Sequence, residues 1–188
     1  MTDASTGFRR TGEREIHQGY IVRFVEAEFE AEDGTTFTRD VVRTPMAVAI
    51  VPVDRGPDGD WEVVLVRQFR APIDALLWEI PAGMCDVVGE ASSETAQREL
   101  AEEAGYRAQH LEVLTPFHPA AGFTDHRTTI FLGVGLDEVG RSADGIEEQH
   151  MEIRRLPLAT ALDWVTAGEI TDAKTIIGLL LAERRLDR

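Results

Sequence analysis

The order of apolar and polar positions along this chain predicts two regions, the first built from strands. Residues 20–30 and 36–43 carry β-branched and aromatic side chains in partial alternation, and the turn signal Asp33-Gly34 separates them. This pattern predicts an antiparallel hairpin of two or three strands, which would be only marginally stable alone. Residues up to about 16 are polar and charged without a period, so we expect a disordered tail there.

The second region, from residue 46 onward, mixes strand and helix patterns. The near-continuous apolar run at residues 47–53 predicts a buried strand. In the last segment, Ile176, Leu179 and Leu180 follow helical spacing and predict a core-facing stripe. Further strands are predicted at residues 61–67, 76–80, 111–117, 128–136 and 151–156, and helices at 92–104, 158–167 and 172–185.

This order of elements predicts an α+β or α/β sandwich, because strands are interrupted by a central helix and closed by two helices. The 188 residues suffice for one globular domain with a small extension. We therefore expect residues 1–45 to form the disordered tail and β-hairpin, and residues 46–188 to form the main domain. The hairpin has to pack on the main domain or on another copy of the chain.

The predicted helix at residues 92–104 carries the first candidate chemistry. Ser92 or Ser93 is expected to cap its N-terminus. Glu99, Glu102 and Glu103 are three and four residues apart, which places three carboxylates on one helical face. Such anions repel one another unless a cation lies between them, and Mg²⁺ or Mn²⁺ prefers oxygen ligands. The alternative is a surface helix whose acidic face is merely solvated.

Charge and cysteine content narrow the classes of partner. The formal net charge is -15, which disfavours binding to nucleic acid or to an anionic membrane. The N-terminal sequence has no apolar core of a signal peptide, and no apolar run is long enough to span a bilayer. Cys85 is the only cysteine and forms no internal disulfide. These features favour a cytoplasmic protein.

Residues 83–106, GMCDVVGEASSETAQRELAEEAGY, resemble the signature of the Nudix hydrolases, G-x5-E-x7-R-E-U-x-E-E-x-G-U, where U is a bulky apolar residue. The seven-residue spacing from Glu90 to Arg98 matches, and so does RELAEEAG at residues 98–105. One departure is that six residues, not five, separate Gly83 from Glu90. The extra residue lies in the loop before the helix and leaves the carboxylate spacing unchanged.

Three further segments resemble the ADP-ribose pyrophosphatase branch of that family. They are RQFR at residues 67–70, EIPAG at 79–83 and PAAGFTD at 119–125. Ala121 replaces the usual proline, and His126 replaces the glutamate that usually follows this motif. The resemblance, over roughly residues 36–182, implies an α/β/α sandwich of the Nudix type. Its mixed sheet would be packed between helices, with an N-terminal antiparallel extension exchanged in a homodimer.

The resemblance also implies roles for individual residues. Glu99 and Glu103 would bind the metal with the Ala82 carbonyl, and Glu102 would be a third ligand or would hold a metal-bound water. Arg98 would anchor the carboxylates. An acidic loop late in the chain would supply the base that activates water, with Glu148 favoured over Glu147. The implied substrate-binding residues are Arg39, Arg67, Arg70, Trp78, Glu79, Gly122 and Phe123.

Several of these residues have a second interpretation that the sequence leaves open. Trp78 and Phe123 either stack on a base or pack in the core. Arg67 either binds the substrate or is a solvated cation at a strand end, whereas Arg70 favours phosphate or ribose oxygens. Glu79 suits ribose hydroxyls or an adenine amino group. His126 either binds the substrate or packs.

The implied activity is Mg²⁺-dependent hydrolysis of ADP-ribose, or of a related ADP-sugar, to AMP and ribose 5-phosphate. One alternative is a Nudix enzyme that acts on another nucleotide sugar or dinucleotide, such as GDP-mannose. Another is a non-catalytic ADP-ribose sensor. The intact set of Glu99, Glu102 and Glu103 argues against the sensor, because a sensor has no need of a metal cluster.

Overall fold

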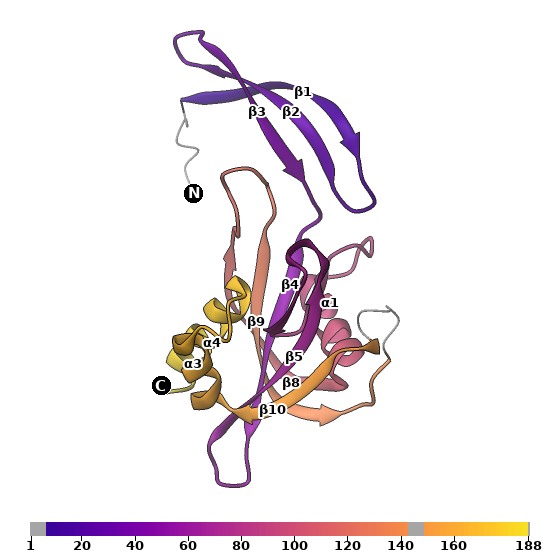
Figure 1. Cartoon of the computed structure of the whole chain (residues 1–188), viewed down its shortest axis with the longest axis vertical. Helices are drawn as coiled ribbons and strands as arrows, with labels where there is room; N and C mark the ends of the chain where they lie inside the picture. Colours follow the sequence, from indigo (N-terminus) through magenta and orange to yellow (C-terminus); the bar gives the residue numbers. More distant parts are fainter. Residues whose placement is uncertain (1–6, 143–148, 188) are drawn as a thin grey trace. The chain divides into compact units, whose positions relative to one another are not determined.

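The structure is a computed structural model that describes residues 7–142 and 149–187. The chain divides into two compact units, coloured by sequence in Figure 1. One contains Met1–Pro45 with Ala120–Arg127, and the other contains Met46–Pro119 with Thr128–Arg188. The sequence placed residues 120–127 in the main domain, but the structure groups them with the N-terminal unit.

The N-terminal unit contains a three-stranded antiparallel sheet of β1 (Phe8–Gln18), β2 (Arg23–Ala31) and β3 (Thr36–Arg43). The predicted hairpin of β2 and β3 is confirmed. The expected disorder up to residue 16 is wrong for residues 8–16, which belong to β1. This stretch lacks apolar alternation because its charged side chains pair across the strands, as Arg9 does with Glu30 and Arg14 with Glu26.

The second unit is built on a seven-stranded sheet. Five of its strands have the order β10-β5-β4-β9-β8, and the other two, β6 and β7, pair with β5 and β4 respectively. β4 and β9 run parallel, and the other described pairs in this unit are antiparallel. The predicted mixed sheet is therefore confirmed. The strand bounds are β4 Ala47–Arg55, β5 Trp61–Arg70, β6 Ala75–Glu79, β7 Ala82–Met84, β8 Tyr106–Phe117, β9 Thr128–Glu138 and β10 Glu152–Pro157.

Helices cover both faces of this sheet. Helices α3 (Leu158–Ala167) and α4 (Ala173–Leu186) lie on one face, and α1 (Ser92–Glu99) lies on the other (Figure 1). A π-helical turn, η2 (Leu100–Ala104), continues α1, and a short 3₁₀ turn, η1 (Ala71–Ile73), joins β5 to β6. The arrangement is the α+β sandwich that the sequence predicted.

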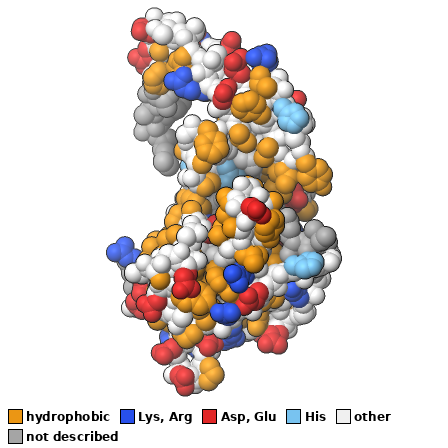
Figure 2. Space-filling view, viewed as in Figure 1, with side chains coloured by type: hydrophobic (Ala, Val, Ile, Leu, Met, Phe, Trp, Pro, Cys, Tyr) orange, Lys and Arg blue, Asp and Glu red, His pale blue; other side chains and the backbone are white. Residues whose placement is uncertain are grey.

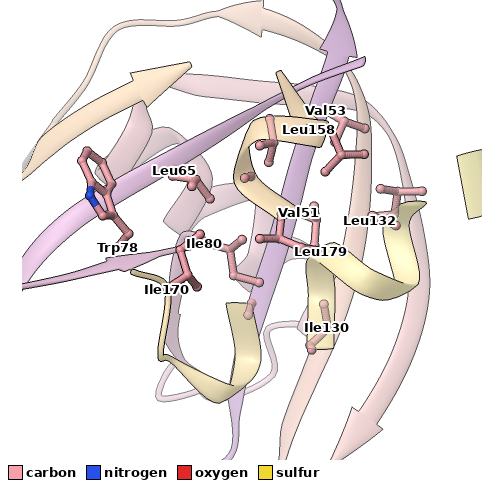
Figure 3. Close-up of a cluster of buried hydrophobic side chains, with 14 of the residues drawn as sticks. Val51, Val53, Leu65, Trp78, Ile80, Ile130, Leu132, Leu158, Ile170 and Leu179 are labelled. Carbon is pink, nitrogen blue, oxygen red and sulfur yellow. The ribbon is translucent and has the colours of Figure 1, made fainter. Parts of the chain in front are cut away.

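Alternate residues of the central strands pack into two separate cores, one on each face. On β5, Leu65 joins the cluster under α3 and α4, with Ile80 and Leu179 among its members (Figure 3). Its neighbour Val66 joins the cluster under α1, together with Leu100. Burial on both faces explains why these strands read as continuous apolar runs.

Helix α4 approaches the sheet closely because a glycine faces it. A β-carbon on Gly178 would lie 2.8 Å from the Val51 side chain, so a larger residue does not fit there. Leu179 is buried, and Ile176 is partly buried against the core. Leu180, however, is 46% exposed, so the predicted core stripe is wrong at this position. The inner face of the helix is centred on small residues, and Leu180 turns away from it.

Apolar patches lie between acidic and basic side chains on the face of the molecule shown in Figure 2. In the N-terminal unit, Phe8, Ile16, Tyr20 and Ile21 are exposed. No helix in the described part of the chain is both long enough and apolar enough to cross a membrane.

Candidate active site

Helix α1 begins differently from the sequence prediction. Its N-cap residue is Ala91, and Ser92 is already the first helical residue, so the expected serine cap is wrong. The Glu94 side chain instead accepts a hydrogen bond from the Ala91 amide at 2.9 Å. A glutamate in this position also favours the positive end of the helix dipole.

The helix ends in the π-helical turn η2, which holds Glu102 and Glu103 and stops at Gly105 in a left-handed conformation with φ of 77°. In this turn the Glu103 side chain points into the core and is buried, whereas Glu102 remains partly exposed. π-helical turns are rare and are frequently found at functional sites. The sequence predicted a helix over residues 92–104 but not this change in its winding.

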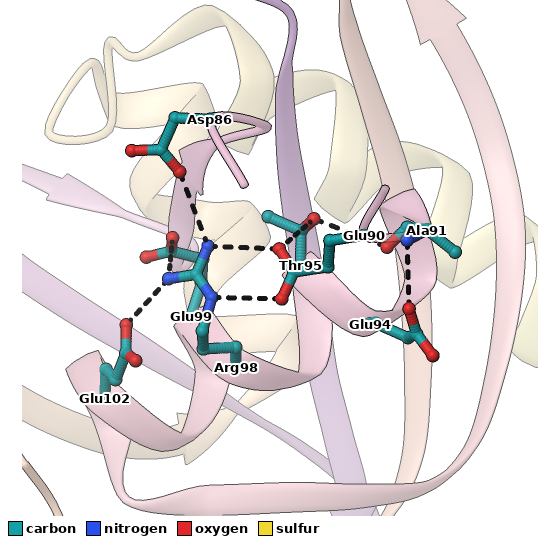
Figure 4. A network of polar contacts seen from close by, with 8 residues as sticks. All are labelled: Asp86, Glu90, Ala91, Glu94, Thr95, Arg98, Glu99 and Glu102. Carbon is teal, nitrogen blue, oxygen red and sulfur yellow. Dashed lines mark hydrogen bonds and ion pairs between the residues drawn. The ribbon is translucent and has the colours of Figure 1, made fainter. Parts of the chain in front are cut away.

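Arg98 lies at the centre of an acid-rich cluster (Figure 4). Its guanidinium donates to Glu99 at 2.8 Å, to Glu102 at 2.9 Å and to Glu90 at 3.3 Å, and lies 3.9 Å from Asp86. Burial alone would lower the pKa of Arg98, but the bond with Glu90 and the charges of Glu99 and Glu102 raise it. Four carboxylates therefore share one cation, beside an open hollow of about 480 Å³ that Arg98 and Glu102 help to line.

Glu99 lies directly against the backbone of β7. A β-carbon on Gly83 would sit 2.0 Å from the Glu99 carboxyl carbon, so the carboxylate occupies the space that a side chain at position 83 would need. The sequence did not predict β7, because a three-residue strand carries no usable pattern. The Glu99 carboxylate can therefore take this position only because residue 83 is a glycine.

The Glu103 side chain is buried, and its carboxyl group accepts a hydrogen bond from the Ala82 amide at 3.0 Å. Burial raises the pKa of Glu103 to about 8. The Ala82 hydrogen bond opposes this shift, the charge of Glu99 adds to it, and Arg70 and Lys174 oppose it. A cation bound beside Glu99 and Glu103 would relieve this unfavourable charge.

Glu79, at the end of β6, is the centre of a second cluster, in which one carboxylate contacts two cations. Its carboxylate is fully buried and accepts two parallel hydrogen bonds from Arg70, at 2.7 Å from Nε and 2.6 Å from the terminal nitrogen Nη2. Lys174 donates to the same carboxylate. Burial alone would raise the pKa of Glu79, but the hydrogen bond from Arg70 and the charges of Lys174 and Arg70 lower it.

The first turn of α4 is attached to the end of β6. Asp172 caps the helix and accepts from the Thr175 amide at 2.9 Å and the Thr175 hydroxyl at 2.6 Å. The Thr175 hydroxyl oxygen in turn accepts from the Ile80 amide at 2.9 Å. Lys174 also lies 3.1 Å from Asp172. Sequence reasoning missed Asp172 and Lys174, whose only signal was a charged pair at the start of a predicted helix.

Trp78 is packed inside an aromatic and cationic cluster. Its ring lies 5.6 Å from the Trp164 ring, and the Arg154 guanidinium lies 4.8 Å from its centre. Arg67 lies 5.7 Å from the same ring and 3.8 Å from Glu152. Two of the predicted substrate-binding residues, Arg67 and Trp78, therefore contact each other beside Glu79.

The predicted substrate-binding residues Arg39, Gly122 and Phe123 belong to the N-terminal unit. The Arg39 guanidinium lies 4.7 Å from the centre of the Phe37 ring. The Phe123 side chain is exposed, and its carbonyl accepts from the Val42 amide at 2.8 Å. A β-carbon on Gly122 would meet nothing within 4 Å.

Two other expectations concern loop residues. His126 packs within the N-terminal unit, with Nδ1 at 3.1 Å from the Pro45 carbonyl and 3.3 Å from the Thr44 hydroxyl. The candidate bases Glu147 and Glu148 lie outside the described residues.

The donor chemistry of the site fits a hard divalent cation, because Glu99 and Glu103 offer carboxyl oxygens and the buried Glu103 carboxyl has no ion pair with a cationic side chain among the described residues. Within residues 7–142 and 149–187, however, no group of three acidic, histidine or cysteine side chains is already gathered as a metal site. Glu99 and Glu102 are instead turned toward Arg98.

Comparison with known proteins places this geometry in a family. The chain is 36% identical over 177 residues to the ADP-ribose pyrophosphatase of Mycobacterium tuberculosis, covering 94% of this chain and 84% of that protein. It is 34% identical over 162 residues to the ADP-ribose pyrophosphatase of Bacillus subtilis, covering 86% and 84%.

The fold agrees with a solved structure described as an ADP compounds hydrolase. The TM-score is 0.83, the sequence identity is 22%, and the match covers 99% of this chain and 97% of the other. Residues 43–177 match the NUDIX domain, and this range includes both charged clusters. The chain belongs to the NUDIX domain family.

Proposed function

We propose that this protein hydrolyses the diphosphate of ADP-ribose, or of a related ADP-sugar, to AMP and ribose 5-phosphate. One structural observation carries the proposal: Glu103, which interacts electrostatically with Glu99, lies within electrostatic reach of Arg70, and Glu79 holds Arg70 in a fixed orientation. A diphosphate needs cationic groups on its oxygens, and a metal-dependent enzyme needs carboxylates beside them. The names of the two bacterial relatives support ADP-ribose as the substrate.

We infer that Mg²⁺ or Mn²⁺ serves this reaction. Glu99, Glu103 and the Ala82 carbonyl would hold it, with Glu102 as a third carboxylate or as the holder of a bound water. When bound, such an ion neutralises phosphate charge and lowers the pKa of a water molecule. Arg98 would hold the carboxylates of Glu99 and Glu102 in place, because it contacts both.

The remaining roles belong to the chain's own side chains. Arg70 would bind diphosphate oxygens, since its side chain is 39% exposed and its nitrogen Nη1 has no hydrogen-bond partner among the described residues. Glu79 is already paired with Arg70 and Lys174, so its main role would be to orient Arg70 and not to contact the ligand itself. Glu148 is our candidate for the group that accepts the proton from water, with Glu147 second.

We also propose that the protein is a homodimer formed through its N-terminal sheet. The exposed side chains of Phe8, Ile16, Tyr20 and Ile21 support this, because apolar surface on a small sheet favours association. In the dimer, Arg39, Gly122 and Phe123 would contact the substrate alongside Arg67 and Trp78. Light scattering at micromolar concentration tests the assembly, and a monomeric mass would contradict it.

Product analysis tests the activity. The protein is incubated with Mg²⁺ and, separately, ADP-ribose, ADP-glucose, GDP-mannose, NADH, FAD and diadenosine polyphosphates, and the products are resolved by chromatography. Selective release of AMP and ribose 5-phosphate from ADP-ribose is the expected result. Omission of the metal, with chelator present, should abolish it.

Two other outcomes would favour the alternative functions. Preferential turnover of another substrate, such as GDP-mannose, would keep the site but assign a different specificity, and would direct attention to Ala121 and His126. Binding of ADP-ribose without any turnover in Mg²⁺ would favour a sensor.

A further inference from the structure

Lys174 is the only lysine in a chain whose Lys and Arg residues number 19. It lies in the first turn of α4, two residues after the N-cap Asp172. A cation there faces the positive end of the helix dipole, which disfavours it. Its side chain is nevertheless only 14% exposed and contacts two carboxylates, those of Glu79 and Asp172. The contact with Glu79 therefore accounts for a cation that the helix alone would not favour.

Glu79 lies between an inner cation and an outer one. Lys174 contacts it from α4, and Arg70 contacts it through Nε and Nη2, so that Nη1 has no hydrogen-bond partner in the described part of the chain. A fully buried carboxylate is stable in its charged form only when it is well paired. Removing the inner cation would leave Arg70 as the sole neutralising partner of Glu79 and would pull Arg70 inward.

We infer that Lys174 is a positioning residue: it holds Glu79 from behind, so that the guanidinium of Arg70 is presented to a diphosphate ligand. This inference rests on the proposed function for the identity of the ligand. Lysine suits the inner place, because its ammonium is a compact point charge and leaves the two-pronged face of the carboxylate to arginine. Lys174 acts through Glu79 and does not contact the substrate.

A double-mutant cycle on ligand binding tests this chain of contacts. The probe is adenosine 5′-(α,β-methylene)diphosphate, which is not hydrolysed, and its dissociation constant is measured by calorimetry in Mg²⁺. Lys174→Met should weaken binding roughly tenfold, by analogy with the loss of an outer partner that orients a metal ligand. Lys174→Arg, which restores the charge, should recover most of the affinity. Arg184→Met, which removes an exposed cation from the same helix, is the matched control and should change nothing.

The decisive comparison uses the Glu79→Gln background. If Lys174 acts only through Glu79, Lys174→Met should add less than about a twofold loss to Glu79→Gln. An equal loss in both backgrounds would show direct contact with the ligand and overturn the inference. So would unchanged affinity in Lys174→Met, or failure of the wild type to bind the probe. Thermal unfolding of each variant confirms that the compared proteins are folded.

Isotope labelling gives a readout that does not depend on turnover. Protein grown with ¹³C- and ¹⁵N-labelled lysine carries a single labelled side chain, that of Lys174, so its NMR signals need no assignment. Glu79→Gln should shift the Cε and Nζ signals, and Arg184→Met should leave them in place. Unchanged signals in Glu79→Gln would overturn the inference whatever the substrate. A wild type that binds the probe but hydrolyses nothing in the panel would instead refute the proposed function alone.

Discussion

The Arg98 cluster and the Glu79 cluster use the same chemical groups in opposite proportion. Around Arg98, carboxylates from Asp86, Glu90, Glu99 and Glu102 share one guanidinium. Around Glu79, one buried carboxylate is shared by Arg70 and Lys174. The first cluster has an excess of negative charge, whereas in the second Arg70 and Lys174 balance the charges of Glu79 and Asp172.

This difference teaches how one site can hold both partners of a metal-dependent phosphate reaction. An excess of carboxylates suits a divalent cation, and an outward-facing arginine suits phosphate oxygens. The two clusters also differ in origin. The first is drawn from 17 consecutive positions, residues 86–102, whereas in the second Glu79 contacts Lys174, which lies 95 positions further along the chain.

The largest effect is expected from a change in the acid-rich cluster. Glu99→Gln keeps the size of the side chain but removes a charge that the proposed metal needs. We expect turnover to fall by about 1,000-fold, comparable with the loss of a group that stabilises charge in the transition state. Circular dichroism and thermal unfolding should remain close to wild type. The exposed Glu169→Gln is the control, and near wild-type activity in Glu99→Gln would refute the metal assignment.

Gly83→Ala tests the same cluster without changing any charge. The added methyl group would occupy the place of the Glu99 carboxylate, which can swing aside because it ends a flexible side chain. We expect activity to fall by about 100-fold, since displacing a catalytic group by about 1 Å costs this much. Gly12→Ala is the matched control, because the nearest atom to a β-carbon there, Oε2 of Glu28, would lie at an ordinary contact distance of 3.5 Å. A fall in thermal stability without a fall in activity per folded molecule would contradict the prediction.

Glu79→Gln should affect stability, and its effect should depend on pH. Losing a buried, charge-assisted hydrogen-bond partner is expected to cost about 1–3 kcal/mol. Because the pKa of Glu79 is lowered in the folded protein, its ionised form stabilises fully above the unfolded value of about 4.3. That stabilisation is lost as pH falls through the lower folded value. The gap between the melting temperatures of wild type and variant should therefore narrow in acid, and a gap independent of pH would refute this.

The smallest effect is expected at another ion pair of α4. Arg185 contacts Glu112 of β8, but both side chains are almost half exposed, at 48% and 47%. Arg185→Gln should change the free energy of unfolding by no more than about 0.5 kcal/mol, because solvent and salt screen such pairs. Chemical denaturation measures this. A loss of unfolding free energy as large as that in Glu79→Gln would show that burial does not explain the different strengths of the two ion pairs.

The sequence predicted most elements of the second unit, because its strands and helices each carry a regular apolar pattern. It failed where tertiary contacts replace that pattern. Strand β1 is charged and finds its partners across the sheet, and β7 is only three residues long. Leu180 follows the helical spacing but lies outward, because Gly178 and Ala182 bring the other face of α4 to the sheet.

The candidate site divides in the same way. The sequence by itself determined that Glu99 and Glu102 share a helical face, because they lie three residues apart. Only the tertiary structure decided that Lys174, at the far end of the chain, reaches Glu79 and that Glu103 is buried. Local spacing determines which side chains share a helix face, whereas the packing of α4 on the sheet determines which distant charges meet.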